Sequence, residues 1–277
     1  MSAVPPKANA LSEIFERPKP LIGTIHCLPF PGSPRYKGED LAVAINHAVE
    51  EALAYEEGGI DGIILENSGD YPFLAPGDVG FETVATMTAV ACAVRDAIEI
   101  PFGVILNWNA AIPAMAVAKA SGAAFIRVNE WVNAYVSNSG IIEGDSGNIL
   151  RYRKNIGAEN VKILADVNVK HGAHALVADR SISDQAWDAE YYDADVIIVT
   201  GTKTGSAAPL EKIEAVRAGT SLPVITGSGL CVENAEDIMP LVDGAIVGTS
   251  LKENGVWWGR VQVDRVKELV DKVSKFR

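Results

Sequence analysis

Two segments near the carboxyl-terminal end decide the fold: Leu222-Pro223-Val224-Ile225-Thr226-Gly227-Ser228-Gly229 and, shortly after it, Asp243-Gly244-Ala245-Ile246-Val247-Gly248-Thr249-Ser250-Leu251-Lys252. In each segment a short apolar run with the composition of a strand leads into a loop of Gly, Ser and Thr. In a (β/α)8 barrel, the loops after the seventh and eighth strands commonly hold a phosphate through backbone N–H groups and a short helix N-terminus. The pair therefore predicts a barrel that binds a phosphorylated small molecule.

Upstream of these loops, apolar strand-like runs alternate with helix-like segments. The predicted strands are Leu21–His26, Ile60–Leu65, Phe102–Leu106, Ala124–Val128, Lys162–Val167, Val196–Val199, Pro223–Thr226 and Ala245–Val247. The predicted helices are Asp40–Glu57, Phe81–Ile98, Ala110–Ser121, Asn148–Asn155, Ser181–Tyr191, Pro209–Ala218, Glu233–Met239 and Gln262–Lys275. Nearly continuous apolar strands are typical of a parallel sheet that is covered on both faces. The eight strands and the two terminal loops favour a single (β/α)8 TIM barrel, an α/β fold, over a doubly wound sheet.

The chain shows no composition shift that would mark a second domain. Residues 1–18, which contain a short apolar patch at Ala10–Phe15, are predicted to be a lead-in that at most caps the bottom of the barrel, and residues 19–277 are predicted to form the single barrel domain. In the first long helix, four-residue spacing predicts the buried stripe. Its members are Leu41, Ile45, Val49 and Leu53.

Composition excludes several classes of protein. The chain has 277 residues, 48% of them hydrophobic, and a formal net charge of -12. Nucleic acids and anionic membranes need a positive field over many contacts, so neither is an expected partner. The sequence has no long apolar run, and its N-terminus lacks the features of a signal peptide, so we expect no membrane insertion and a cytoplasmic location. A homo-oligomer is expected because soluble barrels commonly pair.

Barrel enzymes place their chemistry at the carboxyl ends of the strands, and here polar residues follow almost every apolar run. Glu66 and Asp166 are the best candidates for a general acid and base, because partial desolvation and nearby charges can separate their pKa values. Either carboxylate has a competing interpretation as the ion-pair partner of Arg127 or Lys170. Arg127 is suited to binding a carboxylate or a second phosphate, and Lys170 to donating a proton or forming a Schiff base.

His26 and His171 each follow a strand and are candidates for proton transfer. A divalent metal, if the protein uses one, is expected at His26, Glu66, Asp166 and His171, although no compact metal-binding motif supports it. The remaining strand-end residues are candidates for binding substrate hydroxyl groups. They are Asn67, Asn107, Asn109, Arg127, Asn129 and Thr200.

Glycine and hydroxyl residues make up the predicted phosphate site, because they expose N–H donors without bulky side chains, and a lysine adds a charge. The set is Gly201, Gly227, Ser228, Gly229, Gly248, Thr249, Ser250 and Lys252. Turning of the chain between strand and helix is the competing interpretation of these glycines. FMN would fit the same cradle, but no separate feature indicates a flavin ring. Trp257-Trp258 indicates either a lid over the mouth or a subunit contact.

The strand-end motifs together resemble the BtpA/SgcQ family between residues 20 and 270. They are Ile22-Gly23-Thr24-Ile25-His26, Leu28-Pro29-Phe30-Pro31-Gly32-Ser33-Pro34, Leu65-Glu66-Asn67-Ser68-Gly69-Asp70, Phe125-Ile126-Arg127-Val128-Asn129, Gly140-Ile141-Ile142-Glu143-Gly144, Ala165-Asp166-Val167-Asn168-Val169-Lys170-His171, Val199-Thr200-Gly201, Gly227-Ser228-Gly229 and Val247-Gly248-Thr249-Ser250-Leu251-Lys252. The resemblance implies a barrel related to ribulose-phosphate-binding enzymes. One branch of the family is linked to photosystem I biogenesis, and another is associated with sugar uptake and metabolism.

The chain departs from the family pattern at Asn107-Trp108-Asn109, where an amide stands in place of a carboxylate. This places more of the expected chemistry on Glu66 and Asp166. The leading hypothesis is an enzyme that acts on a phosphorylated sugar or nucleoside-like molecule by isomerisation, carbon–carbon cleavage or glycosidic hydrolysis. The competing hypotheses are a non-catalytic assembly factor, which the photosystem branch implies, and an FMN-binding barrel.

Overall fold

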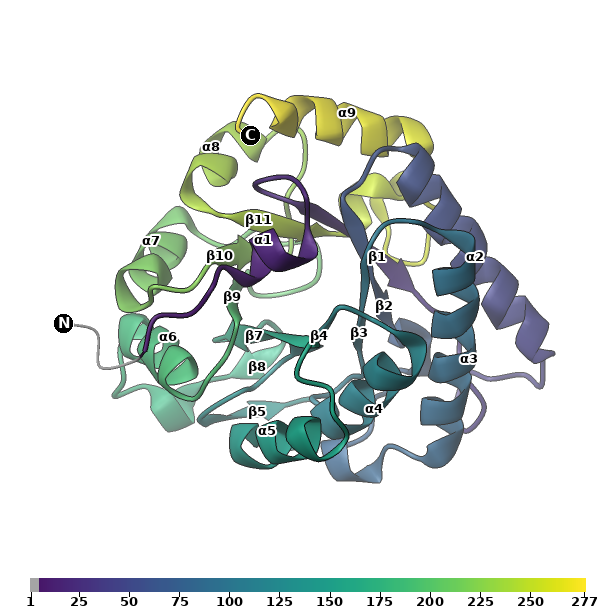
Figure 1. Ribbon diagram of the computed structural model, residues 1–277, viewed down its shortest axis with the longest axis horizontal. Coiled ribbons are helices and arrows are strands. Elements are labelled where there is room, and N and C mark those ends of the chain that lie inside the picture. The colour runs from purple at the N-terminus through teal and green to yellow at the C-terminus, as the bar shows by residue number, and fades with distance from the viewer. Residues whose placement is uncertain (1–4) are drawn as a thin grey trace.

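The computed structural model describes residues 5–277 and contains a closed barrel of parallel strands, in the order β1-β11-β10-β9-β7-β4-β3-β2 (Figure 1). The barrel strands are β1 Leu21–His26, β2 Gly62–Glu66, β3 Phe102–Ile105, β4 Phe125–Val128, β7 Lys162–Val167, β9 Val196–Val199, β10 Val224–Thr226 and β11 Gly244–Val247. Each of them overlaps a predicted strand. The predicted TIM-barrel fold is therefore confirmed.

Helices surround the barrel and cover the outer face of the strands (Figure 1). The α-helices are α1 Ala10–Ile14, α2 Leu41–Glu57, α3 Phe81–Ala97, α4 Ala111–Ser121, α5 Ser146–Asn155, α6 Ile182–Tyr191, α7 Leu210–Gly219, α8 Ala235–Ile238 and α9 Val263–Ser274. Short 3-10 helices lie in the connecting loops. They are η1 Ser68–Asp70, η2 Pro76–Asp78, η3 Ala175–Val177, η4 Met239–Leu241, η5 Thr249–Leu251 and η6 Glu253–Gly255.

The buried face of α2 differs from the predicted stripe. Leu41 and Leu53, at the two ends of that stripe, are 43% and 45% exposed, whereas Ala52 and Tyr55 are fully buried. A β-carbon on Gly23 of β1 would stand only 2.6 Å from the Tyr55 ring. The aromatic ring therefore fills the space that the glycine leaves. Four-residue spacing identified the helix correctly, and Ile45 and Val49 pack against the core, but the two leucines were wrongly assigned to the buried face, because small alanines allow the close approach to β1.

A second, three-stranded antiparallel sheet was not predicted. It has the order β6-β5-β8 and consists of β5 Ala134–Ser137, β6 Gly140–Glu143 and β8 Gly172–Ala173. β5 and β6 form a hairpin whose connection, Asn138-Ser139, has turn composition, so a local signal for it exists. β8 has two residues and follows β7, and only the tertiary structure brings it beside β5.

The barrel interior changes from apolar to polar along the strands. Aliphatic and aromatic side chains fill the lower interior together with Leu11 and Phe15 of the N-terminal segment. Because side chains alternate between the two faces of a strand, the residue two positions further along points to the same side. The pairs are Ile22 and Thr24, Ile64 and Glu66, Phe125 and Arg127, Leu164 and Asp166, and Ile198 and Thr200. The sequence thereby directs its polar groups to the carboxyl ends of the strands.

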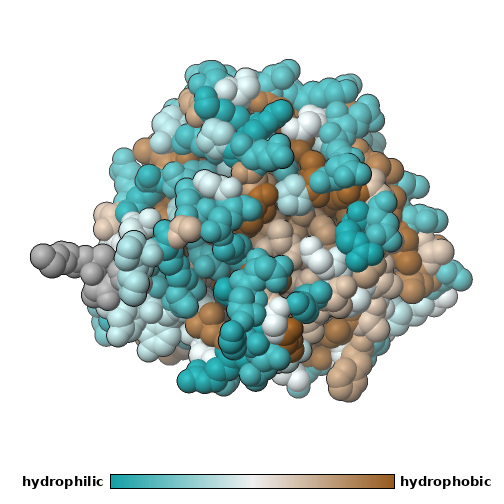
Figure 2. Space-filling model, viewed as in Figure 1, coloured by the Kyte–Doolittle hydropathy of each residue, from teal (hydrophilic) through white to brown (hydrophobic). Residues whose placement is uncertain are grey.

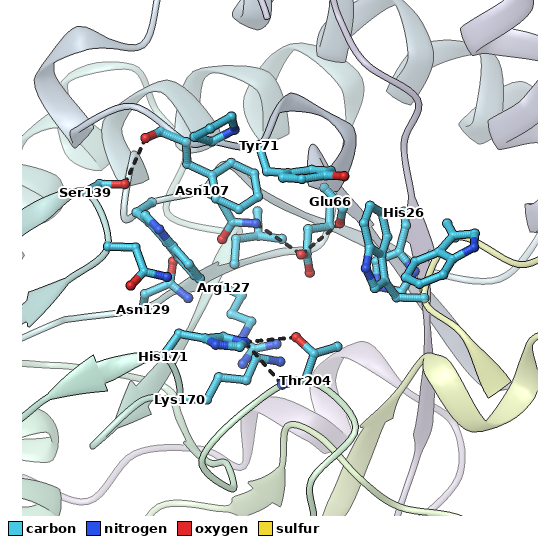
Figure 3. A pocket seen from close by; sticks show the side chains of 18 residues that line it. His26, Glu66, Tyr71, Asn107, Arg127, Asn129, Ser139, Lys170, His171 and Thr204 are labelled. Carbon is cyan, nitrogen blue, oxygen red and sulfur yellow. Dashed lines mark hydrogen bonds between the residues drawn. The ribbon is translucent and has the colours of Figure 1, made fainter. Parts of the chain in front are cut away.

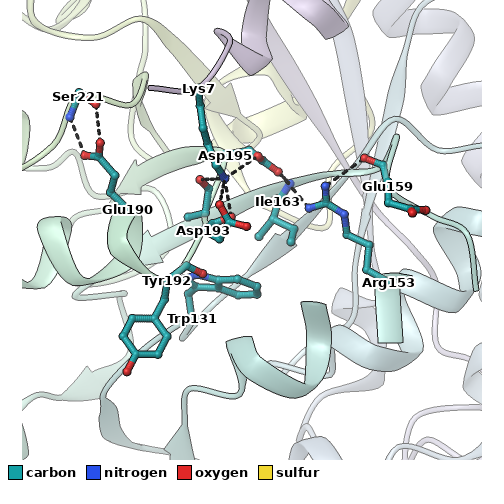
Figure 4. A network of polar contacts seen from close by, with 11 residues as sticks. Lys7, Trp131, Arg153, Glu159, Ile163, Glu190, Tyr192, Asp193, Asp195 and Ser221 are labelled. Carbon is teal, nitrogen blue, oxygen red and sulfur yellow. Dashed lines mark hydrogen bonds and ion pairs between the residues drawn. The ribbon is translucent and has the colours of Figure 1, made fainter. Parts of the chain in front are cut away.

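The N-terminal segment is fixed to the opposite end of the barrel (Figure 4). The Lys7 ammonium donates to the carbonyl of Asp193 at 2.8 Å and to Asp195 Oδ1 at 3.2 Å. Asp195 Oδ2 in turn accepts from the backbone N–H of Ile163 in β7 at 2.9 Å. These contacts hold α1 across the base of the barrel, where Leu11 and Phe15 close the interior.

The outer surface is polar on one side and more apolar on another (Figure 2). Within residues 5–277, no helix is long and apolar enough to cross a membrane. Figure 2 shows hydrophilic residues around the N-terminal segment and more apolar residues toward the side on which α2 and α3 lie in Figure 1. The exposed Leu41, Val43 and Leu53 of α2 belong to this side.

Candidate active site

Two adjoining cavities lie at the carboxyl ends of the strands. We call the larger one, of about 420 Å³, the aromatic chamber, because Tyr71, Phe73, Trp108, Trp257 and Trp258 line it. The smaller one, of about 250 Å³, is the glycine chamber, which the loops after β10 and β11 line. Five side chains border both chambers and therefore stand at their junction. They are His26, Glu66, Arg127, Lys170 and Thr204.

The glycine chamber brings together most of the residues that were predicted to bind phosphate. Gly227, Ser228, Gly229, Gly248, Thr249 and Ser250 all line it. The backbone N–H groups of Gly229, Thr249 and Ser250 have no backbone acceptor among residues 5–277. A β-carbon on Gly248 would stand 3.1 Å from His26 Cε1, so a side chain there would reduce the space beside the junction. The chamber thus offers unpaired N–H donors in a small, glycine-lined space.

Several hydroxyl and glycine groups near this chamber have structural partners instead. Ser228 Oγ donates to the carbonyl of Ser206 at 2.8 Å and accepts from the N–H of Gly201 at 3.3 Å. Ser250 Oγ donates to the carbonyl of Leu230 at 2.7 Å. Gly201 lines neither chamber, and a β-carbon there would stand 2.5 Å from the Ser206 carbonyl oxygen. These groups hold the loops in shape. Close backbone packing explains why a glycine stands at position 201.

Lys252 does not reach the glycine chamber, so its predicted contact with phosphate lacks a structural basis. Its Nζ is 2.6 Å from Glu51 Oε2 of α2, and both side chains are almost fully buried. Glu51 Oε1 also accepts from the N–H of Val261 at 3.0 Å. The pair connects α2 to the segment after β11 outside the barrel. A position in a loop after a strand does not determine whether a side chain turns toward the barrel axis.

Glu66 stands at the junction with one oxygen held and the other unpaired (Figure 3). Its Oε1 accepts from Ser68 Oγ at 2.8 Å and from Asn107 Nδ2 at 3.1 Å, whereas Oε2 has no partner among the described residues. Burial opposes ionisation, but neighbouring positive charges, Lys170 and Arg127 among them, outweigh it and lower the pKa of Glu66. The carboxylate is therefore ionised at neutral pH. Its Oε2 is available to accept a proton, as a general base requires.

Asp166 has the ion-pair role that competed with its catalytic interpretation. Arg127 Nε donates to Asp166 Oδ2 at 2.8 Å and Nη2 donates to Oδ1 at 2.9 Å. Both Asp166 oxygens are thereby engaged, and the residue lines neither chamber. Burial opposes the charge of Arg127, but Asp166 outweighs it and raises the Arg127 pKa. The pair leaves Arg127 Nη1 without a hydrogen bond to a described residue, and Arg127 borders both chambers.

Lys170 lies across the junction from Glu66 (Figure 3). Its ammonium has no ion-pair partner within the described residues, and burial together with the nearby Arg127 lowers its pKa to about 8. The backbone N–H of Lys170 donates to Thr200 Oγ1 at 2.9 Å, so Thr200 positions the lysine and does not itself line a chamber. A lysine that titrates near neutral pH can donate a proton.

The two candidate histidines occupy different sides of the aromatic chamber. His171 Nε2 accepts from the N–H of Thr204 at 3.1 Å, and burial with the adjacent Lys170 lowers its pKa. Burial lowers the pKa of His26 to about 3, and its Nδ1 is buried without a partner in the described part of the chain. Both imidazoles are therefore neutral at neutral pH.

The candidate metal ligands do not assemble into one site. Within residues 5–277, no group of three or more His, Cys, Asp or Glu side chains is close enough to hold a metal ion. Arg127 occupies both oxygens of Asp166. His26 and His171 line different sides of the chamber (Figure 3).

The predicted asparagines divide into two groups. Asn107 and Asn129 line the aromatic chamber, as predicted for substrate-binding residues. Asn67 and Asn109 do not line it, and their amides hold loops together. Asn67 Oδ1 accepts from the N–H of Asn107 at 2.8 Å, and Asn109 Oδ1 accepts from the N–H of Glu130 at 2.8 Å. They position the neighbouring strand ends instead of contacting the cavity.

Loops contribute further cavity residues that the sequence did not single out as site residues. Asn138 and Ser139 come from the β5–β6 hairpin, and Thr204 comes from the loop after β9. The Ser139 hydroxyl donates to the carbonyl of Phe73 at 2.8 Å, which joins two rim loops (Figure 3). Recognition of the hairpin turn would have indicated the first two. Trp257 and Trp258 line the chamber, which favours the interpretation as a rim over the cavity.

Nearly the whole chain is similar to known proteins. The BtpA family model matches residues 17–275. The chain belongs to the BtpA family. An uncharacterized protein from Archaeoglobus fulgidus is 42% identical over 252 residues, which cover 91% of this chain and 97% of the relative. The photosystem I biogenesis protein BtpA of Synechocystis sp. is 38% identical over 88% of this chain and 84% of its own length.

Solved structures show that this BtpA-family chain shares its fold with known barrel proteins. Tryptophan synthase from Mycobacterium tuberculosis matches with a TM-score of 0.59 at 16% identity and covers 98% of both chains. Thiamine phosphate pyrophosphorylase from Pyrococcus furiosus matches with a TM-score of 0.56 at 17% identity, over 93% of this chain and 96% of its own. At these identities the likeness shows the TIM-barrel fold alone.

Proposed function

We propose that this BtpA-family protein is an enzyme that acts on a phosphorylated sugar or nucleoside-like small molecule by acid–base catalysis at the mouth of the barrel. One observation carries the proposal: a glycine chamber suited to an anion opens into a larger chamber at Glu66, Arg127 and Lys170. A substrate that spans both chambers would place its phosphate in the first and its reacting centre beside the proton-transfer groups.

The anion end of the proposed site combines backbone and side-chain donors. The N–H groups of Gly229, Thr249 and Ser250 supply hydrogen bonds without charge. Arg127 Nη1 adds a permanent charge, and Lys170 adds a second charge below about pH 8. Hydrogen bonds in which one partner is charged contribute about 1.5–3 kcal/mol each, so a few of them suffice for a micromolar phosphate site.

The proton-transfer end uses Glu66 as the base and Lys170 as the acid. Glu66 is ionised and has one unpaired oxygen, whereas Lys170 carries a proton that its lowered pKa makes easier to release. Neutral His26 and His171 would donate or accept hydrogen bonds at hydroxyl groups. Isomerisation, carbon–carbon cleavage and glycosidic hydrolysis all require one base and one acid on opposite sides of a reacting bond.

The experiment is a thermal-shift screen of the purified protein with a panel of phosphosugars and nucleotides, followed by incubation of each stabilising compound and analysis of products. We expect stabilisation by phosphorylated compounds only. Glu66→Gln is expected to retain that stabilisation. Its turnover of the substrate should be slower by about 100-fold or more, because general acid–base catalysis typically contributes at least that much. Glu57→Gln, an exposed substitution on α2, is the matched control.

The competing function is a non-catalytic assembly factor, supported by the 38% identity with the photosystem I biogenesis protein of Synechocystis. An assembly role does not require a carboxylate, a lysine and an arginine around one junction. If no phosphate compound stabilises the protein and a protein partner does, the enzyme proposal is wrong.

A further inference from the structure

The aromatic chamber has walls that suit a flat ring. We propose that it binds the base of a nucleoside 5′-monophosphate, whose phosphate occupies the glycine chamber. The inference rests on the proposed function, which places the phosphate in the glycine chamber. It narrows the proposed substrates to phosphorylated compounds that carry a planar nitrogen base.

One wall of the chamber is built around Trp108. Its ring centroid is 5.1 Å from that of Phe73, at an interplanar angle of 66°, and 6.2 Å from that of His171, at 45°. Trp108 is only 7% exposed, so its neighbours fix its orientation, yet it borders the cavity. A fixed aromatic wall is a stacking surface that loses little conformational entropy when a ligand binds.

Trp257 forms the other wall. Its ring packs edge-on against Tyr71 at 5.7 Å and against His26 at 5.7 Å. The Arg35 guanidinium lies 3.8 Å from the centroid of Tyr71, which orients that ring further. Figure 3 shows His26 and Tyr71 on one side of the cavity and His171 with Asn129 on the other. The residues that hold the two tryptophans therefore lie on different sides of the cavity.

Amide groups stand where the edge of a bound base would lie. Asn107 uses its Nδ2 on Glu66, which leaves its Oδ1 as an acceptor. Asn129 uses its Oδ1 on the N–H of Asn109, which leaves its Nδ2 as a donor. Both border the aromatic chamber. One free acceptor and one free donor can pair with the polar edge of a nucleobase, since asparagine amides present complementary groups to bases.

A bare sugar phosphate fits this chamber less well. A sugar ring carries hydroxyl groups around its circumference, and each of them needs a hydrogen-bond partner when it is removed from water. The chamber offers aromatic surfaces from Phe73, Trp108 and Trp257 in addition to its polar groups. Every nucleobase has a face that stacks on such surfaces, whatever its identity. The walls therefore favour a base over a second set of hydroxyl groups.

Calorimetric titration tests the proposal with five ligands: adenosine 5′-monophosphate, cytidine 5′-monophosphate, ribose 5-phosphate, inorganic phosphate and flavin mononucleotide. We expect at least one of the two nucleotides to bind about tenfold or more tightly than ribose 5-phosphate, because base stacking adds affinity of this order. Trp257→Leu, at a half-buried position, is expected to remove this difference while phosphate still binds. Trp108→Leu should have the same effect. Trp187→Leu, which changes an exposed tryptophan on α6 that stacks on Tyr191, is the control and should change nothing.

The outcomes separate this inference from the proposed function. Equal binding of ribose 5-phosphate and both nucleotides overturns the base-binding chamber and leaves a phosphosugar enzyme. If flavin mononucleotide binds more tightly than both nucleotides, the proposal that the ligand is a nucleoside 5′-monophosphate is wrong. Absence of binding by all phosphate compounds overturns the inference and the proposed function together. A nucleotide preference that persists in both Trp257→Leu and Trp108→Leu also contradicts the assignment to these walls.

Discussion

Two buried ion pairs lie near the mouth of the barrel and serve different purposes. Arg127 and Asp166 meet inside the barrel, with Arg127 Nε 2.8 Å from Asp166 Oδ2. Lys252 and Glu51 meet outside it, with Lys252 Nζ 2.6 Å from Glu51 Oε2. Exposed fractions of the four side chains are 3% or less. Burial and distance are thus nearly the same, but of the four residues only Arg127 borders the two chambers.

The difference lies in which donors remain after the pair has formed. Arg127 is held by Nε and Nη2 and keeps the donors of Nη1 unpaired among the described residues, because a planar guanidinium presents donors on more than one edge. Lys252 directs its charge to Glu51, beneath the segment that contains Val261. A buried charge at a barrel mouth is therefore evidence for a binding site only when some of its hydrogen-bonding capacity faces a cavity.

The largest expected effect is the loss of stability when the pair outside the barrel, Lys252 and Glu51, is broken. Lys252→Met leaves the Glu51 carboxylate buried without its partner, and we expect the free energy of unfolding to fall by about 3–5 kcal/mol. Chemical denaturation measures this change. The double variant Lys252→Met/Glu51→Leu should recover most of the loss, because two apolar residues leave no unpaired charge. A single variant as stable as the native protein would contradict this assignment.

Loss of the pair inside the barrel, Arg127 and Asp166, should weaken anion binding as well as lower stability. Arg127→Met removes the guanidinium that faces the junction, and we expect sulfate affinity to fall about tenfold or more, since a charged hydrogen bond contributes about 1.5–3 kcal/mol. Calorimetry with sulfate measures it at a temperature where circular dichroism shows a folded protein. The folded Lys252→Met/Glu51→Leu variant should bind sulfate normally. Equal weakening in both variants would remove the functional distinction between the pairs.

A third prediction concerns pH at the same junction. The pKa of Lys170 is lowered to about 8, so its ammonium is charged below that pH and becomes neutral as the pH rises through it. Sulfate keeps its charge over this range, and we expect its affinity to fall severalfold between about pH 7 and pH 9. Lys170→Met should flatten the curve, whereas the exposed Lys267→Met should not. An unchanged slope in Lys170→Met would assign the titration to another group.

The smallest effect is expected at Ser228, a polar residue of the glycine chamber that is used structurally. Ser228→Ala removes the hydrogen bonds to the Ser206 carbonyl and the Gly201 N–H, and we expect a loss of about 1 kcal/mol in the free energy of unfolding. Urea denaturation measures it. Sulfate affinity should stay within about twofold, because the backbone N–H donors remain. A large loss of affinity would show that the hydroxyl itself contacts the anion.

Much of the fold could be predicted because its signals are local. Every barrel strand overlaps an apolar run that the sequence shows, and the loops after β10 and β11 meet at one chamber as their glycines indicate. The buried face of α2 was misassigned at its ends, because burial depends on the close approach of Ala52 and Tyr55 to β1. The sheet of β5, β6 and β8 was missed because β8 is too short to have a pattern of its own.

The candidate site was less predictable than the fold. Glu66, Arg127, Lys170 and the two histidines were identified as residues that follow or end strands, and all of them line the aromatic chamber. Asp166 was identified by the same criterion, but Arg127 occupies both of its oxygens. Tyr71, Phe73 and Trp108 were not singled out, because a lone aromatic residue in a loop carries no signal that distinguishes a cavity wall from a core.

The sequence by itself determined which residues reach the mouth of the barrel. Strand alternation places Thr24, Glu66, Arg127 and Asp166 two positions beyond apolar residues of the interior, and this periodicity is a property of the chain. Only the tertiary structure decided which of these groups remain available. Partner choice depends on residues far apart in the sequence, such as Lys252 and Glu51, and closure of the barrel brings them within hydrogen-bonding distance.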